Sequence, residues 1–107
     1  MNTTKDQALD AVLERLIAAY LPEKVFLFGS RARDDSGSDS DYDILVIVPD
    51  DAPLERRRSR LAYEQLWGTG AAADVLVWTS GYFESRAHLN SSLAATVIRE
   101  GKLLYAV

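Results

Sequence analysis

The apolar run from Ile44 to Val48 constrains the fold of this chain more than any other feature. Its residues, Ile-Leu-Val-Ile-Val, follow one another without a polar interruption, and Pro49 ends the run. A strand with one face in water alternates apolar and polar residues, whereas an unbroken apolar strand has both faces covered. The sequence therefore predicts a sheet with a layer of helices on each side.

The segments around this strand, which is expected over residues 41–48, alternate between helical and extended patterns. Apolar residues at helical spacing from Leu9 to Tyr20 predict a helix that Pro22 ends. Further strands are expected over residues 24–28, 73–78 and 102–105, and further helices from 51 or 52 to about 67, from 79 or 80 to about 87, and from 90 or 91 to 101. Strands that alternate with helices indicate an α/β fold, and 107 residues predict one domain over residues 1–107.

Several side chains outside the central strand are also expected in the core or on the surface. On the last helix, Leu93, Val97 and Ile98 form the expected inner face. The large aromatic residues are interpreted as core rather than as platforms for stacking bases: Phe26, Phe28, Trp67 and Trp78. Four arginines crowd into one expected helix and are interpreted as a solvated face, with contact to an acidic partner or RNA as the alternative: Arg56, Arg57, Arg58 and Arg60.

The composition excludes several classes of function. Without cysteine, the chain has no disulfide scaffold, no thiolate metal site and no thiol nucleophile. Twelve basic against sixteen acidic residues leave a net charge of −4, which argues against a broadly basic nucleic-acid-binding surface. No apolar run reaches the ~18 residues of a membrane helix, and residues 1–6 show no export signal. A cytoplasmic location is therefore expected.

Gly29 and Ser30 stand where the expected strand 24–28 gives way to a helical turn. Glycine lets the backbone approach a ligand closely, and free N–H groups at the start of a helical turn attract anions. These residues could therefore cradle a phosphate. A plain tight turn is the more common meaning of the same two residues.

Three aspartates are candidate metal ligands. Asp41 and Asp43 are two residues apart at the start of a strand and so share one face, where their mutual repulsion calls for a cation or a proton. Mg²⁺ prefers carboxylate oxygens together with substrate phosphates. Asp74 begins another apolar strand and would join the pair if the two strands are neighbours. The alternatives are that Asp41 and Asp43 are ordinary loop and strand-end charge, and that Asp74 only ends the preceding loop.

The spacing of these residues resembles a known signature. Gly29-Ser30, ten further residues, and then Asp41-Tyr42-Asp43 is similar to the pattern of the minimal nucleotidyltransferases (MNT) of the DNA polymerase β-like superfamily. The resemblance implies a single-domain nucleotidyltransferase fold with a mixed central sheet flanked by helices. It also implies that Gly29, Ser30 and Arg33 bind the triphosphate. Asp34 stands where the family often has glycine, and its charge would weaken that binding.

The same resemblance implies an activity and a partner. Asp41, Asp43 and Asp74 would be the catalytic residues and would bind Mg²⁺ in a two-metal site, with ATP as the substrate. Family members of this size are similar to antitoxins that transfer AMP to a tyrosine of a HEPN ribonuclease toxin, a helical protein. The alternatives are an antitoxin that neutralises the toxin by binding alone, and transfer to a hydroxyl of a small molecule. Neither a membrane nor direct DNA binding is expected.

Overall fold

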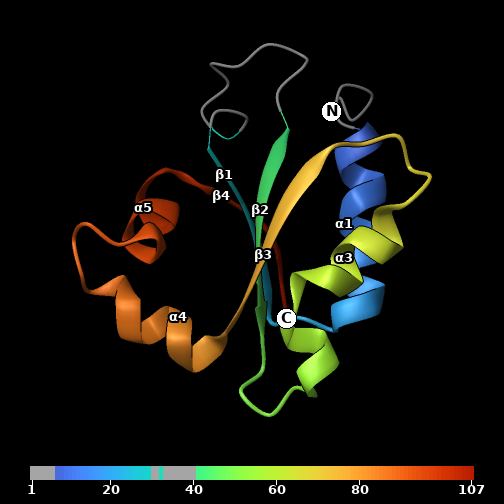
Figure 1. Ribbon diagram of the computed structural model, residues 1–107. Coiled ribbons are helices and arrows are strands. Elements are labelled where there is room, and N and C mark those ends of the chain that lie inside the picture. The colour runs from blue at the N-terminus through green and yellow to red at the C-terminus, as the bar shows by residue number, and fades with distance from the viewer. Residues whose placement is uncertain (1–6, 30–31, 33–40) are drawn as a thin grey trace.

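One four-stranded sheet forms the centre of the protein. The computed structural model describes residues 7–29, 32 and 41–107 (Figure 1). Its strands are β1 (Lys24–Phe28), β2 (Tyr42–Val48), β3 (Ala73–Thr79) and β4 (Lys102–Ala106), in the order β3-β2-β1-β4. β1 is antiparallel to β2 and to β4, whereas β2 and β3 are parallel. The expected mixed sheet is therefore confirmed.

Helices cover both faces of this sheet. They are α1 (Gln7–Tyr20), the short 3₁₀ helix η2 (Leu54–Arg57), α3 (Ser59–Leu66), α4 (Ser80–Ala87) and α5 (Leu93–Glu100). In Figure 1, α1 and α3 lie on one side of the sheet, and α4 and α5 lie on the other. No helix in the described ranges has the length and apolar character that crossing a membrane requires.

The side chains of β2 alternate between two apolar clusters. Ile44, Val46 and Val48 pack in the cluster that contains the buried face of α1. Leu45 and Ile47 pack with buried residues of α4 and α5. Residues 44–48 are at most 2% exposed, so the prediction that this strand is covered on both faces is confirmed. Phe26, Phe28 and Trp78 pack against the second cluster, also as predicted.

The prediction of one continuous helix up to residue 67 is wrong. At Arg58 the backbone is extended, with φ −118° and ψ 144°, and this residue separates η2 from α3. The buried Tyr20 hydroxyl lies at the break, where it donates to the carbonyl oxygen of Arg58 and accepts from the N–H of Ala62 at 2.9 Å. Burial raises the pKa of Tyr20 to about 12. Hydrogen bonds from a distant helix therefore override the local helical pattern, and the arginines do not share one helix face.

Two further packing predictions are wrong. Trp67 is 86% exposed and Ile98 is 55% exposed. Helix α5 begins at Leu93, later than expected, with the Ser92 hydroxyl accepting from the N–H of Ala95 at 3.1 Å. This helix turns two alanines and Val97 inward, because small side chains allow it to approach the sheet closely, and Ile98 is left in solvent.

Candidate active site

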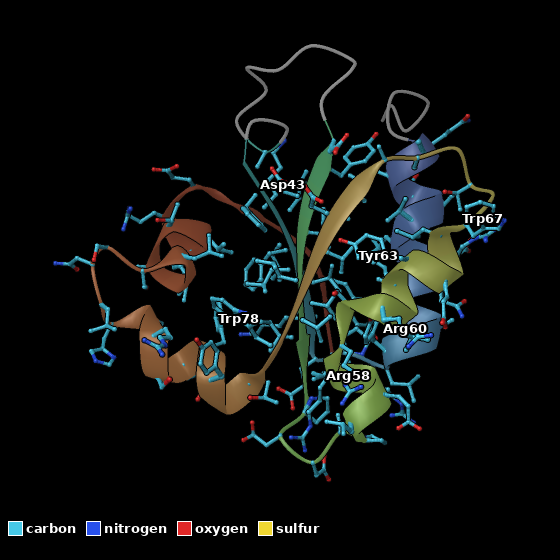
Figure 2. The ribbon with its side chains drawn as sticks, viewed as in Figure 1. Asp43, Arg58, Arg60, Tyr63, Trp67 and Trp78 are labelled. Carbon is cyan, nitrogen blue, oxygen red and sulfur yellow. The ribbon has the colours of Figure 1, made fainter. Side chains whose placement is uncertain are left out.

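Two of the three candidate aspartates lie side by side on neighbouring strands. Asp43 of β2 pairs in register with Asp74 of β3. Residues paired in this way project to the same face, and the strands lie about 4.8 Å apart. On β2, the residues directly before and after Asp43 pack in the cluster that contains α1, so the Asp43 side chain points to the opposite face. On β3, Asp74 is four residues before Trp78, which packs with α4 and α5, so these two side chains share a face. Both carboxylates therefore face the α4 and α5 side, at the end of the sheet where Figure 2 shows Asp43.

The third aspartate, Asp41, is exposed and immediately precedes β2. Burial raises the pKa of the half-buried Asp43 carboxyl, and the negative charges of Asp74 and Asp41 raise it further. Asp41 is two residues before Asp43 along the chain, and Asp43 pairs with Asp74, so the three aspartates lie at the same end of the sheet. The sequence left open whether Asp74 joins the pair, and the parallel register of β2 and β3 brings it there.

Gly29 lies directly against Asp43. Its φ is +77°, and a Cβ atom at this position would overlap the Oδ2 atom of Asp43. The N–H of Ala32 donates to the carbonyl oxygen of Gly29 at 3.1 Å, so a turn begins here as β1 ends. Glycine is needed both for the backbone angle and for the space that the carboxylate occupies. Ser30, Arg33 and Asp34 lie outside the described residues.

The donor set suits a divalent cation that a substrate helps to bind. Within the described ranges, no three His, Cys, Asp or Glu side chains are grouped closely enough to hold a metal ion by themselves. Mg²⁺ is usually held by one or two carboxylates together with substrate phosphates and water, so a complete protein cage is not required. The adjacent carboxylates of Asp43 and Asp74 supply such a pair, and a cation would offset the repulsion that raises the pKa of Asp43.

A hollow of about 410 Å³ borders Asp41 on the α3 side of the sheet. Tyr63 and Trp67 line it, together with backbone and small side chains of the loop that leads to β3. The Tyr63 hydroxyl accepts a hydrogen bond at 3.5 Å from the N–H of Val75, the residue after Asp74. Tyr63 was not among the residues that the sequence motifs indicated. Two aromatic residues four positions apart on an amphipathic helix, beside charged residues, were the available signal.

The model of the nucleotidyltransferase domain family matches residues 6–102. A comparison with curated proteins gave no match. A candidate nucleotidyltransferase from Sulfolobus solfataricus has a similar structure, with 21% identity over 94% of this chain and 78% of that chain, and a TM-score of 0.61.

Two other solved structures come from toxin–antitoxin systems. A chain of a toxin–antitoxin structure with AMP-PNP is 22% identical over 90% of this chain and 72% of that chain, with a TM-score of 0.58. A chain in the complex of the tri-AMPylated Shewanella oneidensis HEPN toxin with an MNT antitoxin is 20% identical over 100% and 74% of the two chains, with a TM-score of 0.51. These similarities show a shared fold. Because the family model covers most of the sequence, the chain belongs to the family of nucleotidyltransferase domains and is a nucleotidyltransferase.

Proposed function

We propose that this protein is an antitoxin that transfers AMP from ATP to a tyrosine hydroxyl of a HEPN ribonuclease, in a Mg²⁺-dependent reaction. The observation that carries the proposal is the pairing of Asp43 with Asp74 on neighbouring strands, with Gly29 packed against Asp43. Two structures with the same fold support it, since one contains AMP-PNP and the other an AMPylated HEPN toxin with its MNT antitoxin.

The carboxylates of Asp43 and Asp74, with Asp41, would hold Mg²⁺ at the end of the sheet. When bound, the ion neutralises charge on the triphosphate and on the attacking oxygen. The turn at Gly29 lies on the β1 side of these carboxylates and would receive the β- and γ-phosphates, with Ser30 and Arg33 as further contacts. Asp74 lies on the β3 side, at the edge of the sheet, where a second substrate can approach.

The proposed reaction is an in-line displacement at the α-phosphorus. The tyrosine oxygen forms a new bond to this phosphorus, and the bond from the phosphorus to the bridging oxygen of the β-phosphate breaks. Pyrophosphate leaves with the electron pair. The exposed Asp74 carboxylate is positioned to orient the hydroxyl and to pass its proton to solvent. Positioning and charge neutralisation provide most of the rate enhancement in a transfer of this kind.

The proposal treats residues 1–107 as one nucleotidyltransferase domain. It assigns the reaction to the cytoplasm, where ATP and a ribonuclease target are both present. Neither DNA nor a membrane takes part in it.

The test is incubation of the purified protein with α-labelled ATP and the HEPN-fold protein encoded beside its gene. We expect label on a tyrosine of that protein with Mg²⁺ and none with EDTA. An Asp41→Asn/Asp43→Asn variant should transfer no label, whereas Asp51→Asn, which changes an exposed aspartate beyond the other end of β2, should retain transfer. Unlabelled partner under all conditions contradicts the proposal. Full protection of cells by the double variant would favour an antitoxin that acts by binding alone.

A further inference from the structure

The outer face of α3 carries an unusual set of exposed side chains. We call Arg58, Arg60, Tyr63 and Trp67 the α3 surface: Arg60 and Tyr63 lie on this helix, and Arg58 and Trp67 flank it. Figure 2 shows all four on the side of the sheet away from Trp78. Trp67 is 86% exposed and Tyr63 is 48% exposed. Exposed tryptophan and tyrosine side chains in one patch are typical of the centres of protein–protein interfaces.

The fold itself does not need the Trp67 side chain. Helix α3 is held to the core by the buried residues Ala62 and Leu66, and by the hydrogen bond from the Ala62 N–H to Tyr20. A side chain that leaves most of its surface in water contributes little to burial. The position of Trp67 therefore calls for an explanation outside this chain.

The charge of this surface is opposite to that of the whole chain. Four of the twelve basic residues occupy positions 56–60 of a chain with a net charge of −4. Arg57 donates to the backbone oxygens of Ala52 and Asp50, at 2.8 and 3.0 Å. Arg60 forms a surface ion pair with Glu64, at 3.5 Å, with its own side chain 85% exposed. Such a pair contributes little, so Arg60 and the exposed Arg58 remain accessible to an acidic surface.

The α3 surface is continuous with the candidate active site. Tyr63 and Trp67 line the same hollow of about 410 Å³ as Asp41. The hydrogen bond from the Val75 N–H to the Tyr63 hydroxyl joins this surface to the strand that carries Asp74. A molecule that covers Trp67 and fills this hollow therefore reaches Asp41, the aspartate just before β2.

The position of the surface also indicates the size of its ligand. Asp43 and Asp74 face the side of the sheet covered by α4 and α5, whereas the α3 surface lies on the other side. A ligand that contacts both must extend around the end of β3. A folded protein meets this requirement more readily than a nucleobase or a small acceptor.

We propose that the α3 surface is the docking site for the acceptor protein, whose matching surface is an apolar pocket for Trp67 with an acidic rim. The inference rests on the proposed function, because the acceptor protein is the second substrate of that reaction. Docking at this surface would bring the acceptor hydroxyl to the carboxylates from the β3 edge. Binding energy at a distance from the reacting atoms then serves to position the hydroxyl.

The experiment measures the affinity of the protein for the neighbouring HEPN-fold protein by calorimetry. Trp67→Ala should raise the Kd roughly 30-fold or more, as expected for a central aromatic residue of an interface. Arg58→Glu/Arg60→Glu should raise it about tenfold or more at low salt and reduce its dependence on salt. Matched controls on the opposite side of the sheet, Ile98→Ala (55% exposed) and Arg99→Glu on α5, should change it less than about twofold. The affinity for MgATP and the melting temperature should stay unchanged in every variant.

The outcomes separate this inference from the proposed function. If the wild type transfers AMP and Trp67→Ala binds and modifies the partner equally well, the docking site is wrong and the function stands. If Trp67→Ala weakens binding of the partner but the wild type transfers no AMP, the docking site stands and the proposed reaction is wrong. A weakened affinity for MgATP would identify Trp67 as a base-stacking residue and overturn the inference. Dissociation of a wild-type dimer by Trp67→Ala, seen by sedimentation, would assign the surface to self-association and also overturn it.

Discussion

An aspartate lies near each end of β2 and packs against a glycine, but the groups that surround the two carboxylates differ. Beyond the end of β2, Asp50 accepts a hydrogen bond from the N–H of Gly81 at 2.8 Å. At the start of β2, Asp43 packs against Gly29. There, burial and the neighbouring carboxylates of Asp74 and Asp41 raise its pKa.

We interpret this difference as one between a structural carboxylate, Asp50, and a proposed functional one, Asp43. A carboxylate that accepts a backbone N–H stabilises the fold, because the donor offsets part of its lost hydration. Carboxylates that are brought together and partly buried oppose folding until a cation or a proton arrives. The fold tolerates this cost at one end of β2 only, and the affected end is the proposed catalytic end.

The largest expected effect is a difference in the rate of AMP transfer between variants at the two ends of β2. Asp43→Asn should reduce AMP transfer by roughly 100- to 1,000-fold, because the substitution removes a charge that the site needs in the transition state. Asp50→Asn should leave transfer unchanged, since its amide oxygen can still accept from Gly81. The measurement is the single-turnover rate at saturating MgATP. Equal losses in both variants would show that the two ends do not differ in function.

The next effect concerns the two glycines. Gly29→Ala should lower the free energy of unfolding by about 2–4 kcal/mol and reduce AMP transfer, because alanine disfavours the φ of +77° and its Cβ displaces Asp43. Gly81→Ala should change stability by less than about 1 kcal/mol, since the helix favours alanine and the Asp50 oxygens, 3.0 and 3.1 Å from the new Cβ, lie on a side chain that can shift.

Gly68→Ala provides the matched control for Gly29. Gly68 has a similar φ of +85°, and nothing lies within 4 Å of a Cβ placed there. Its substitution should therefore show the backbone cost alone, about 1–2 kcal/mol, with transfer intact. Urea denaturation of the three variants gives the values. If Gly29→Ala and Gly68→Ala lose equal stability and both remain active, the contact between Gly29 and Asp43 has no consequence.

A smaller effect is expected at Tyr20, a buried polar side chain that, like Asp50, forms hydrogen bonds with the backbone. Tyr20→Phe should lower the free energy of unfolding by about 1–3 kcal/mol, because the backbone groups of Arg58 and Ala62 lose their partner. Tyr82→Phe, at an exposed tyrosine, is the control and should be neutral.

The pKa of Tyr20 predicts an additional dependence on pH. Folding raises this pKa from 10.0 to about 12, so the folded state holds the proton more tightly than the unfolded state. The contribution of Tyr20 is fully present below pH 10 and is lost as the pH rises toward 12. Between these limits, the free energy of unfolding should therefore fall more steeply with rising pH for the wild type than for Tyr20→Phe. Parallel curves would contradict the assignment.

The smallest expected effect is on stability at Asp43, measured in EDTA. Because folding raises the pKa of Asp43, the folded state binds the proton more tightly and loses stability as the pH rises from the ordinary value of 3.8 through the raised one. At pH 7 Asp43→Asn should therefore be more stable than the wild type by about a few tenths of a kcal/mol. The gain should disappear in acid. A variant that is less stable than the wild type at pH 7 would show that Asp43 stabilises the fold as Asp50 does.

The parts of the fold that local patterns determine could be predicted from the sequence. The unbroken run at residues 44–48 indicated a covered strand, and Asp41 and Asp43 stood out by their spacing. The break at Arg58 could not be predicted, because it depends on the Tyr20 hydroxyl, 38 residues away. Trp67 lies just past the end of α3, which turns Ala62 and Leu66 inward, and its side chain stays exposed.

The site was predictable in its residue types and not in its contacts. That Asp74 joins Asp43 depends on the parallel register of two strands separated by η2 and α3, which no local pattern contains. The sequence suggested that Gly29 makes room for a ligand, whereas the side chain that it accommodates is Asp43. Contacts between distant segments are set by tertiary packing, and periodicity carries no information on them.

A crystal structure of the protein with Mg²⁺ and AMP-PNP tests the central claim most directly. We predict a cation between the carboxylates of Asp43 and Asp74, in contact with the phosphates, and the β- and γ-phosphates against the turn at Gly29. A nucleotide bound elsewhere, or a filled phosphate site whose cation touches neither carboxylate, would contradict the account.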